Sequence, residues 1–523
     1  MRLSTRVLFL LAAMVSVESV VAQAAVKLPS VIGSHMVLQR NQPVPVWGWA
    51  AEGEDVTVRF GGKTLAAKAD KTGRWQVTLP KLAANAQPQA MVIEDSSGSR
   101  IELTDILVGD VWFCTGPSNI FWPVSKCDNA KEEIRQATFP RIRFFTVAKK
   151  TADKPQNDCV GSWFGCSPRT VGDVSGIGYF FSRRLHQDLD VPVGLLQSFW
   201  GGSRVEAWTS KEALESQPAL KPILEWWDKA FADYDVDRVN TDYQQQLERW
   251  KQLVAVAKSQ GKKAPARPTK PQDPRTSQHR PASLYNGMIA PLIPFRIRGV
   301  ISYQGLGNLY WAEHSRVLMS TMIRDWRSRW GQGAFAFGMV QPAPFPCARW
   351  PKQQEDAYAL QRESQVLILN EFPKTGIALT MDIDALDELH FTNKQIVGKR
   401  MAQWALATEY RKKVPYAGPV FESLTIENDK ARIRFAHTTK GLSTSDGRAP
   451  THFTIAGKDK TFYPATAVID GKTVLVHSKQ VTNPVAVRFA WSDTAVPNLV
   501  NSDGLPASLF RTDVPPLRKP QSK

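Results

Sequence analysis

The stretch Val108-Gly-Asp-Val-Trp-Phe-Cys-Thr-Gly-Pro-Ser-Asn119 decides the fold of this chain. Its first part is mostly apolar without polar alternation, and a tight Gly-Pro turn follows it. A short apolar run of this kind is typical of a strand that is buried on both faces of a parallel sheet. We therefore predict a buried strand over residues 108–114, which ends in a sharp turn and presents the hydroxyl group of Ser118.

Downstream of this stretch, similar strand patterns alternate with helical patterns. Further buried-type strands are predicted at 191–196, 299–303, 334–341 and 377–381. Amphipathic helices are predicted at 177–189 and 393–407, where apolar residues recur three or four positions apart. This alternation predicts an α/β domain with a mostly parallel sheet and crossover helices.

Shorter strands with alternating apolar and polar residues flank the α/β domain. Runs at 44–49 and 56–60 precede it, and runs at 431–436 and 485–489 follow it. Such alternation is typical of half-buried strands, so we predict two small β-sandwich domains that brace the α/β domain. The predicted division of the chain is 1–24 for a signal peptide, 25–104 for the first β-sandwich, 105–414 for the α/β domain, 415–513 for the second β-sandwich and 514–523 for a tail.

An excursion at 220–281 interrupts the predicted α/β domain. Residues 220–258 have a helical pattern, and residues 261–281 carry prolines among Lys and Arg, which predicts an extended connector. The excursion either shapes an entrance to a site or only covers surface, and we favour surface coverage.

The composition is typical of a folded, multidomain protein. The chain has 523 residues, 43% of them hydrophobic and 22% charged, which excludes the disordered, collagen-like and coiled-coil classes. The formal net charge is +17, but the basic residues are scattered through every segment, so we predict no nucleic-acid binding. Attraction to anionic envelope or glycan surfaces is the other interpretation of this charge.

The beginning of the sequence predicts export. Arg2 and Arg6 precede an apolar run at 7–17, and Ala22-Gln-Ala24 provides a small-x-small cleavage site, which is the order of a secretory signal peptide. No later run reaches the ~18 apolar residues of a membrane span. We therefore expect a soluble periplasmic or extracellular product.

The cysteines predict neither a full disulfide framework nor a metal site. Their number, five, leaves at least one thiol unpaired. An oxidising compartment would permit a bridge among Cys127, Cys159 and Cys166. Paired CxxC motifs are missing, so we predict no structural zinc.

Polar residues directly after the predicted strands form the candidate site, because the site of an open α/β sheet lies beyond the carboxyl ends of its strands. Ser118 is the candidate nucleophile. Gly201 and Gly202 follow the next predicted strand, and a glycine backbone lets an N–H group approach a ligand closely, so both are candidate oxyanion donors. Asn308 follows the third predicted strand, and its carboxamide is a further candidate donor.

His390 is the candidate general base, with Asp387 as the carboxylate that orients it. Taken singly, such residues are more often caps, turns or structural residues. Together they supply a hydroxyl nucleophile, a base, an orienting group and oxyanion donors once each, which is the set that acyl transfer requires. The residues alone therefore predict a serine esterase.

Six longer blocks carry a resemblance to a known family. They are His35-Met-Val-Leu-Gln-Arg40, Val108-Gly-Asp-Val-Trp112, Trp200-Gly-Gly-Ser-Arg-Val-Glu-Ala-Trp208, Leu284-Tyr-Asn-Gly-Met-Ile-Ala-Pro291, Asn393-Lys-Gln-Ile-Val-Gly398 and Leu505-Pro-Ala-Ser-Leu-Phe-Arg511. These blocks resemble those of the sialate O-acetylesterase family, which are carbohydrate esterases with an SGNH-hydrolase catalytic domain. The resemblance spans nearly all of the chain after residue 24, and it implies a three-layer α/β/α catalytic domain between the two β-sandwiches.

The resemblance also implies a mechanism without metal or cofactor. Ser118 would be acylated by the O-acetyl group of a sugar, and His390 would shuttle the proton. The N–H groups of Ser118 and of the Gly201–Gly202 pair, with the side chain of Asn308, would form the oxyanion hole. The implied substrate is an O-acetylated sialic acid, or alternatively a plant cell-wall polysaccharide such as xyloglucan or xylan.

The chain departs from the usual family blocks close to the candidate site. Pro117 and Ile120 replace the Gln and Met of Gly-Gln-Ser-Asn-Met, and Leu306 replaces the Glu of Trp-Tyr-Gln-Gly-Glu-Ser-Asn. Family sequences place the orienting carboxylate two or three residues before the His, so Glu388 and Asp387 are rivals, and a backbone carbonyl is a third alternative. These departures keep a catalytically impaired, glycan-binding homologue open as another interpretation.

Overall fold

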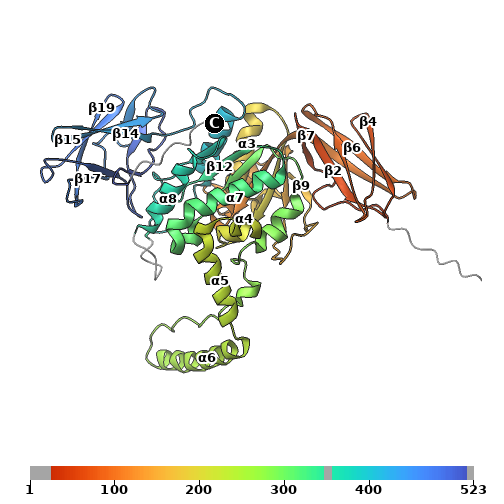
Figure 1. The fold of residues 1–523 in the computed structure, drawn as a ribbon, viewed down its shortest axis with the longest axis horizontal. Helices are drawn as coiled ribbons and strands as arrows, with labels where there is room; N and C mark the ends of the chain where they lie inside the picture. The colour runs from red at the N-terminus through yellow and green to blue at the C-terminus, as the bar shows by residue number, and fades with distance from the viewer. Residues whose placement is uncertain (1–24, 347–355, 515–523) are drawn as a thin grey trace, which may run out of the picture.

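The computed structural model describes residues 25–346 and 356–514. The predicted signal peptide, Cys347 and the predicted tail beyond residue 514 lie outside the described residues. The chain is a mixed α/β protein with a central sheet and with further β-sheets toward both ends (Figure 1).

The central sheet is built around β7 (Arg100–Gly116), which contains the stretch at 108–114. β7 pairs in parallel with β10 (Val193–Phe199) on one side and with β11 (Gly299–Ser302) on the other. The strand order is β13-β12-β11-β7-β10-β8-β9, with β9 antiparallel to β8 at one edge. The other strands are β8 (Phe139–Thr146), β9 (Trp163–Cys166), β12 (Ala336–Val340) and β13 (Thr375–Ala378). The mostly parallel sheet and the strands predicted at 108–114, 191–196, 299–303 and 334–341 are therefore confirmed, to within a few residues at their ends. The strand predicted at 377–381 lies earlier, at Thr375–Ala378, and is only partly buried because it forms the edge of the sheet.

Helices cover both faces of this sheet. Successive residues of β7 point to opposite faces, so Phe113 packs against Trp326 on one face, with ring centroids 5.7 Å apart. On the other face Trp112 packs edge-on against Phe181 and Trp404. Trp326 lies on α7 (Ser315–Trp330), Phe181 on α3 (Gly176–Leu189) and Trp404 on α9 (Lys394–Thr408). The helices predicted at 177–189 and 393–407 are therefore confirmed, and both cover the same face.

The sheets toward the two ends are largely antiparallel. The first part of β7 pairs with β6, whereas its second part pairs with β10 and β11, so one strand runs through the predicted border at residues 104 and 105. The strands before the central sheet are β1 (Val37–Gln39), β2 (Val44–Trp49), β3 (Asp55–Phe60), β4 (Lys63–Lys68), β5 (Arg74–Leu79) and β6 (Asn85–Asp95).

The last part of the described chain forms sheets of order β14-β15-β20-β19, β18-β17-β21-β23 and β16-β22. Their strands are β14 (Val420–Glu427), β15 (Lys430–Ala436), β16 (Leu442–Thr444), β17 (Phe453–Ala456), β18 (Phe462–Pro464), β19 (Thr466–Asp470), β20 (Thr473–His477), β21 (Ala486–Phe489), β22 (Leu499–Asn501) and β23 (Phe510–Arg511).

The excursion contains two helices, α5 (Lys221–Asp233) and α6 (Val236–Ser259), and α6 lies away from the body of the protein in Figure 1. The remaining α-helices are α1 (Ser118–Phe121), α2 (Ala130–Arg135), α4 (Lys211–Glu215) and α8 (Ala357–Ile368). Across residues 25–346 and 356–514, the helices are too short or too polar to cross a membrane.

The four described cysteines, Cys114, Cys127, Cys159 and Cys166, are buried free thiols. The bridge that the sequence permits among the last three is therefore not formed. Cys159 belongs to one hydrophobic cluster, whereas Cys127 and Cys166 belong to the cluster on the other face of the sheet. Within that cluster the thiol of Cys127 donates to the carbonyl of Pro123 and the thiol of Cys166 to the carbonyl of Ala137.

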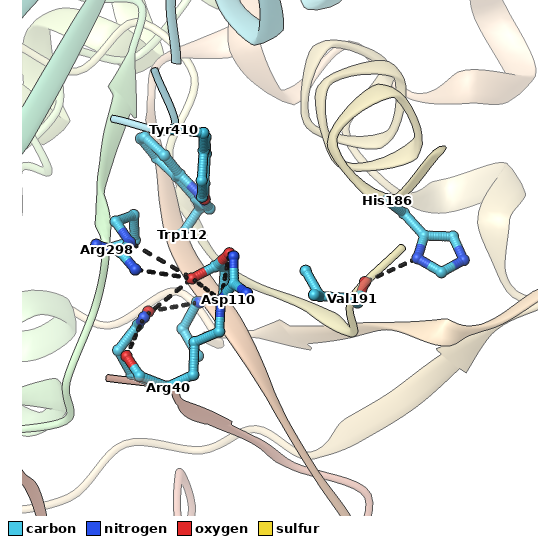
Figure 2. Close-up of polar contacts among 9 residues, drawn as sticks. Arg40, Asp110, Trp112, His186, Val191, Arg298 and Tyr410 are labelled. Atoms are coloured by element: carbon cyan, nitrogen blue, oxygen red, sulfur yellow. Dashed lines mark hydrogen bonds and ion pairs between the residues drawn. The ribbon is translucent and has the colours of Figure 1, made fainter. Parts of the chain in front are cut away.

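A buried charge cluster anchors the amino-terminal end of β7 in the central sheet (Figure 2). The carboxylate of Asp110 is fully buried and accepts hydrogen bonds from Arg40 at 2.8–3.1 Å and from Arg298 at 3.2 Å. The Tyr410 ring lies near both guanidinium groups, and its hydroxyl accepts a hydrogen bond from Trp112 Nε1 at 3.1 Å. The cluster ties β7 to the segment before β11, and it lies at the opposite end of the strand from Ser118.

Candidate active site

Ser118 begins α1 directly after β7, and its Oγ lies 2.7 Å from Nε2 of His390. The preceding turn depends on Gly116, whose φ of +141° is accessible to glycine. A Cβ at this position would lie 2.4 Å from the carbonyl oxygen of Tyr303, so a larger residue does not fit. Pro117 lacks its own N–H group but leaves that of Ser118 in place. The strand and turn therefore present the hydroxyl group to the imidazole.

The imidazole of His390 is held by ring stacking. It lies parallel to the indole of Trp122, with centroids 4.9 Å apart and an interplanar angle of 8°. Burial lowers the pKa of His390 below its ordinary value, and the positive charge of Lys394 lowers it further, against the opposing effect of Glu388. A lowered pKa keeps the imidazole neutral near pH 7, which is the state that accepts a proton.

Two carboxylates, Glu388 and Asp387, are candidates for orienting the imidazole of His390. Glu388 Oε1 lies 3.8 Å from Nδ1 of His390, which is too long for a hydrogen bond, and it accepts the backbone N–H of His390 at 2.9 Å. The side chain of Glu388 is 64% exposed. Asp387 precedes it in the same loop. The choice among Asp387, Glu388 and a backbone carbonyl stays a prediction.

The glycine loop after β10 lies against the serine. A Cβ on Gly201 would lie 3.8 Å from the Cβ of Ser118, and Gly202 has a φ of +71°. The loop after β11 packs on this glycine loop, backbone against backbone, because a Cβ on Gly307 would lie 2.8 Å from the carbonyl oxygens of Gly202 and Ser203. The two predicted oxyanion segments therefore lie next to each other beside Ser118.

Asn308 is fully buried, and both ends of its carboxamide are fixed. Its Oδ1 accepts the backbone N–H of Val205 at 2.8 Å, and its Nδ2 donates to Glu206 Oε2 at 2.7 Å. Glu206 is also fully buried, and burial raises its pKa although Arg204 lies nearby. Glu206 thus orients the predicted oxyanion donor, and one of the two Nδ2 hydrogens is used in doing so.

Sequence reasoning missed Glu206, Trp122, Asn119 and Lys394. The Nζ of Lys394 donates to Asn119 Oδ1 at 2.7 Å, and Asn119 Nδ2 donates to the carbonyl of Leu389 at 3.0 Å. This chain of bonds ties the helix that starts at Ser118 to the loop that carries His390. Lys394 is fully buried, and burial lowers its pKa to about 7. The signal in the sequence was that Asn119 follows Ser118 directly and that Glu206 and Lys394 lie inside quoted blocks without an assigned role, whereas Trp122 had no such signal.

Aromatic groups lie on α1 and on the segment before Gly201, the two segments that meet at the serine, and a cationic group lies near them. The ring of Phe121 is 38% exposed and packs against Phe199, with centroids 5.5 Å apart. The ammonium group of Lys149 lies 6.0 Å from the Phe121 ring and 5.9 Å from the Trp200 ring. Exposed aromatic faces with a nearby cation are suited to the apolar face and polar rim of a sugar ring.

A metal site is not formed by the described residues. Between residues 25 and 346 and between 356 and 514, no three His, Cys, Asp or Glu side chains are grouped so that they could hold an ion.

The chain is similar to known esterases over most of its length. It is 34% identical to a carbohydrate acetylesterase from Xanthomonas citri, whose solved structure matches with a TM-score of 0.78 and covers 93% of this chain and 99% of that one. It is 27% identical to the sialate O-acetylesterase of Rattus norvegicus, with 75% of this chain and 76% of the relative covered. It is 25% identical to the sialate O-acetylesterase of Homo sapiens, with 79% and 76% covered. No protein-family model matches the chain.

These relatives and the site together define an enzyme of the carboxylic ester hydrolase class. More particularly, the chain belongs to the sialate O-acetylesterase family.

Proposed function

We propose that this protein is an exported serine esterase that removes O-acetyl groups from carbohydrates, with O-acetylated sialic acid as the substrate. The observation that carries the proposal is the 2.7 Å distance between Ser118 Oγ and His390 Nε2 at the carboxyl end of the central strand. The names of the relatives, which are sialate O-acetylesterases and a carbohydrate acetylesterase, support the substrate class.

The proposed mechanism uses an acetyl-enzyme. His390 takes the proton of Ser118 while Oγ attacks the acetyl carbonyl carbon. The resulting oxyanion is stabilised by the N–H groups of Ser118 and the Gly201–Gly202 pair and by Asn308 Nδ2. The C–O bond to the sugar then breaks, and His390 gives its proton to the leaving sugar oxygen. In the second half, His390 deprotonates a water molecule that attacks the acetyl group, and acetate and free Ser118 result.

The arrangement of the central sheet supports an SGNH-hydrolase domain with an α/β/α layer order. In such a domain, the serine, a glycine, an asparagine and a histidine come from four strand ends, as Ser118, Gly201, Asn308 and His390 do here. The division into a first β-sandwich at 25–104, a catalytic domain at 105–414 and a second β-sandwich at 415–513 belongs to the same proposal.

The proposal favours an active enzyme over a glycan-binding homologue. Pro117 and Leu306 depart from the usual family blocks, but the Ser118–His390 pair has hydrogen-bond geometry and Asn308 is held at both ends of its carboxamide. An acetylesterase for a plant cell-wall polysaccharide would use the same groups, so the substrate has to be measured.

The test is acetate release from p-nitrophenyl acetate, from O-acetylated sialic acid and from acetylated xyloglucan. We expect Ser118→Ala and His390→Ala each to lower kcat at least about 1,000-fold. The matched control is Ser125→Ala, since Ser125 is an exposed serine seven positions along the chain. Wild-type rates in Ser118→Ala, or no release from any ester by folded wild-type protein, would contradict the proposal.

A further inference from the structure

The excursion forms a defined arm rather than a covering of the body. In α6 the buried residue is Ala257, and the rest of the helix is exposed or half-exposed. The helix lies away from the body of the protein (Figure 1). The connector that follows folds back on α6, because Trp250 Nε1 donates to the carbonyl of Pro265 at 2.9 Å and Arg267 lies 5.9 Å from the Trp250 ring. The sequence-based preference for surface coverage is therefore wrong for α6, which extends into solvent.

The second half of this arm carries a concentrated positive charge. Between Glu248 and Asp273 the sequence contains no acidic residue, and it contains Arg249, Lys251, Lys258, Lys262, Lys263, Arg267 and Lys270. All seven of these side chains are exposed. Lys251 pairs with Glu248 at 2.7 Å, and among the described carboxylates none forms an ion pair with the other six. We call residues 249–272 the basic arm; it is an exception to the otherwise scattered charge.

Both ends of the excursion contact the glycine loop beside the site. At the start, Arg204 lies 5.1 Å from the Trp226 ring and 5.6 Å from the Trp227 ring, both on α5. At the end, His279 faces Gly202, where a Cβ would lie 3.5 Å from its Cε1. The excursion that carries the basic arm is therefore attached to the body of the protein beside the candidate active site.

We propose that the basic arm is an accessory binding site for a polyanionic, carboxylate-bearing polysaccharide, which it holds next to the ester-cleaving site. The proposal rests on the proposed function in one respect, namely that the substrate is a carbohydrate. Exposed cations without carboxylate partners create a local positive potential that concentrates a polyanion and is sensitive to salt. A narrow polysaccharide chain can follow the basic arm alone.

An anionic membrane fits the arm less well. The part of α6 that precedes the basic arm carries, with its cap, Asp235, Asp237, Asp242 and Glu248. An anionic bilayer that bound α6 along its length would repel these carboxylates. The exposed apolar residues of the second half are Leu253 and Val256, at 49% and 50% exposure, and two residues do not form the continuous apolar stripe of an interfacial helix.

The first test measures binding of de-esterified polygalacturonate to the full-length protein, at low and high salt. The arm variant combines Lys258→Gln, Lys262→Gln, Lys263→Gln and Lys270→Gln. The control variant removes the same charge elsewhere, at the exposed lysines Lys63, Lys71, Lys458 and Lys472, each changed to Gln. We expect the arm variant to bind at least about tenfold more weakly at low salt, and the control variant to bind like the wild type.

Equal weakening in both variants would show that net charge alone drives binding, and unchanged binding in the arm variant would show that the arm is not the site. Both results would overturn the proposal. Arm-dependent binding to phosphatidylglycerol vesicles without binding to polygalacturonate would also overturn it, in favour of a membrane.

The second test separates the arm from the chemistry. With O-acetylated polysialic acid as substrate, a carboxylate-bearing polymer of the proposed substrate sugar, we expect the arm variant to raise KM at least about fivefold at unchanged kcat, with p-nitrophenyl acetate hydrolysis unchanged. Ser118→Ala should stop acetate release but bind polygalacturonate like the wild type. If the wild type releases no acetate from any ester, the proposed function alone is contradicted. If the KM of the arm variant is unchanged, the role of the arm is contradicted.

Discussion

Lys394 places a buried ammonium group close to the proposed general base. Its positive charge lowers the pKa of His390, and its own pKa of about 7 means that it is charged throughout the acid range in which His390 titrates. Lys394→Met removes this charge and therefore raises the pKa of His390. Since the base must be neutral to accept the proton of Ser118, we expect the acid limb of the kcat/KM profile to move to higher pH.

The measurement is the pH profile of kcat/KM for a soluble acetyl ester, with Lys399→Met as the control. Lys399 is an exposed lysine on the same helix, so its removal should leave the acid limb in place. An acid limb that moves to lower pH in Lys394→Met, or that stays where the control has it, would refute this electrostatic role.

Glu206 fixes the direction of the Asn308 carboxamide through a 2.7 Å bond to Nδ2. A glutamine at this position presents either an oxygen or an NH₂ group, so the orientation of Asn308 is no longer unique. We expect Glu206→Gln to lower kcat about 10- to 100-fold with a small change in KM, because the oxyanion forms only in the transition state. Steady-state kinetics beside the exposed control Glu215→Gln test this, and a change confined to KM would argue against it.

The two candidate orienting carboxylates, Asp387 and Glu388, are both exposed. Glu388 is mostly exposed and lies 3.8 Å from Nδ1, so its removal takes away a screened charge. We expect Asp387→Asn to lower kcat more than Glu388→Gln does, by a factor of about 10 or more. Comparison of kcat for the two variants decides between them, and a larger loss in Glu388→Gln would assign the role to Glu388.

At the residue scale, the sequence predicted those catalytic residues that come soon after a predicted strand. Ser118 and His390 were found in this way, and the structure places them in contact. Lys394 and Glu206 were not found, because their partners Asn119 and Asn308 lie 275 and 102 positions away in the sequence. Hydrogen bonds over such separations depend on the tertiary fold, which a single sequence does not reveal.

At the element scale, the strands that are buried on both faces were predictable and the others were less so. β8 was missed because Phe139-Pro-Arg-Ile-Arg-Phe-Phe-Thr146 contains a proline and two arginines and does not look like a buried run. β7 was predicted too short, because its first part alternates exposed and buried residues as part of another sheet. The helical excursion was predicted as one segment, whereas α5 and α6 are separated at Tyr234 and Asp235.

The buried charge cluster at the start of the central sheet should contribute to stability and not to chemistry. Asp110→Asn leaves Arg40 and Arg298 without a carboxylate partner in a largely buried position. We expect the free energy of unfolding to fall by about 3–5 kcal/mol, while kcat of the folded protein stays the same. Thermal unfolding followed by circular dichroism, with kcat measured well below the transition, tests both parts; an unchanged Tm would show that the cluster is not stabilising.

At the scale of the whole molecule, the central sheet brings together residues that are far apart in the sequence. Parallel strands end at one edge, so the segments after β7, β10 and β11 meet, and the loop that follows β13 adds His390. The flanking sheets contribute none of the predicted catalytic residues. The two functions that we propose lie in different places: ester cleavage at the sheet edge, and polymer binding on the basic arm, whose excursion is attached beside that edge.

The central claim is that Ser118 carries the acetyl group during turnover. The most direct measurement is mass spectrometry of peptides from enzyme that is acid-quenched during hydrolysis of an acetyl ester. We predict one added acetyl group on the peptide that contains Ser118 in the wild type, and none in His390→Ala. Acetate release at wild-type rates by Ser118→Ala, with no acetyl group found on Ser118 of the wild type, would contradict the account.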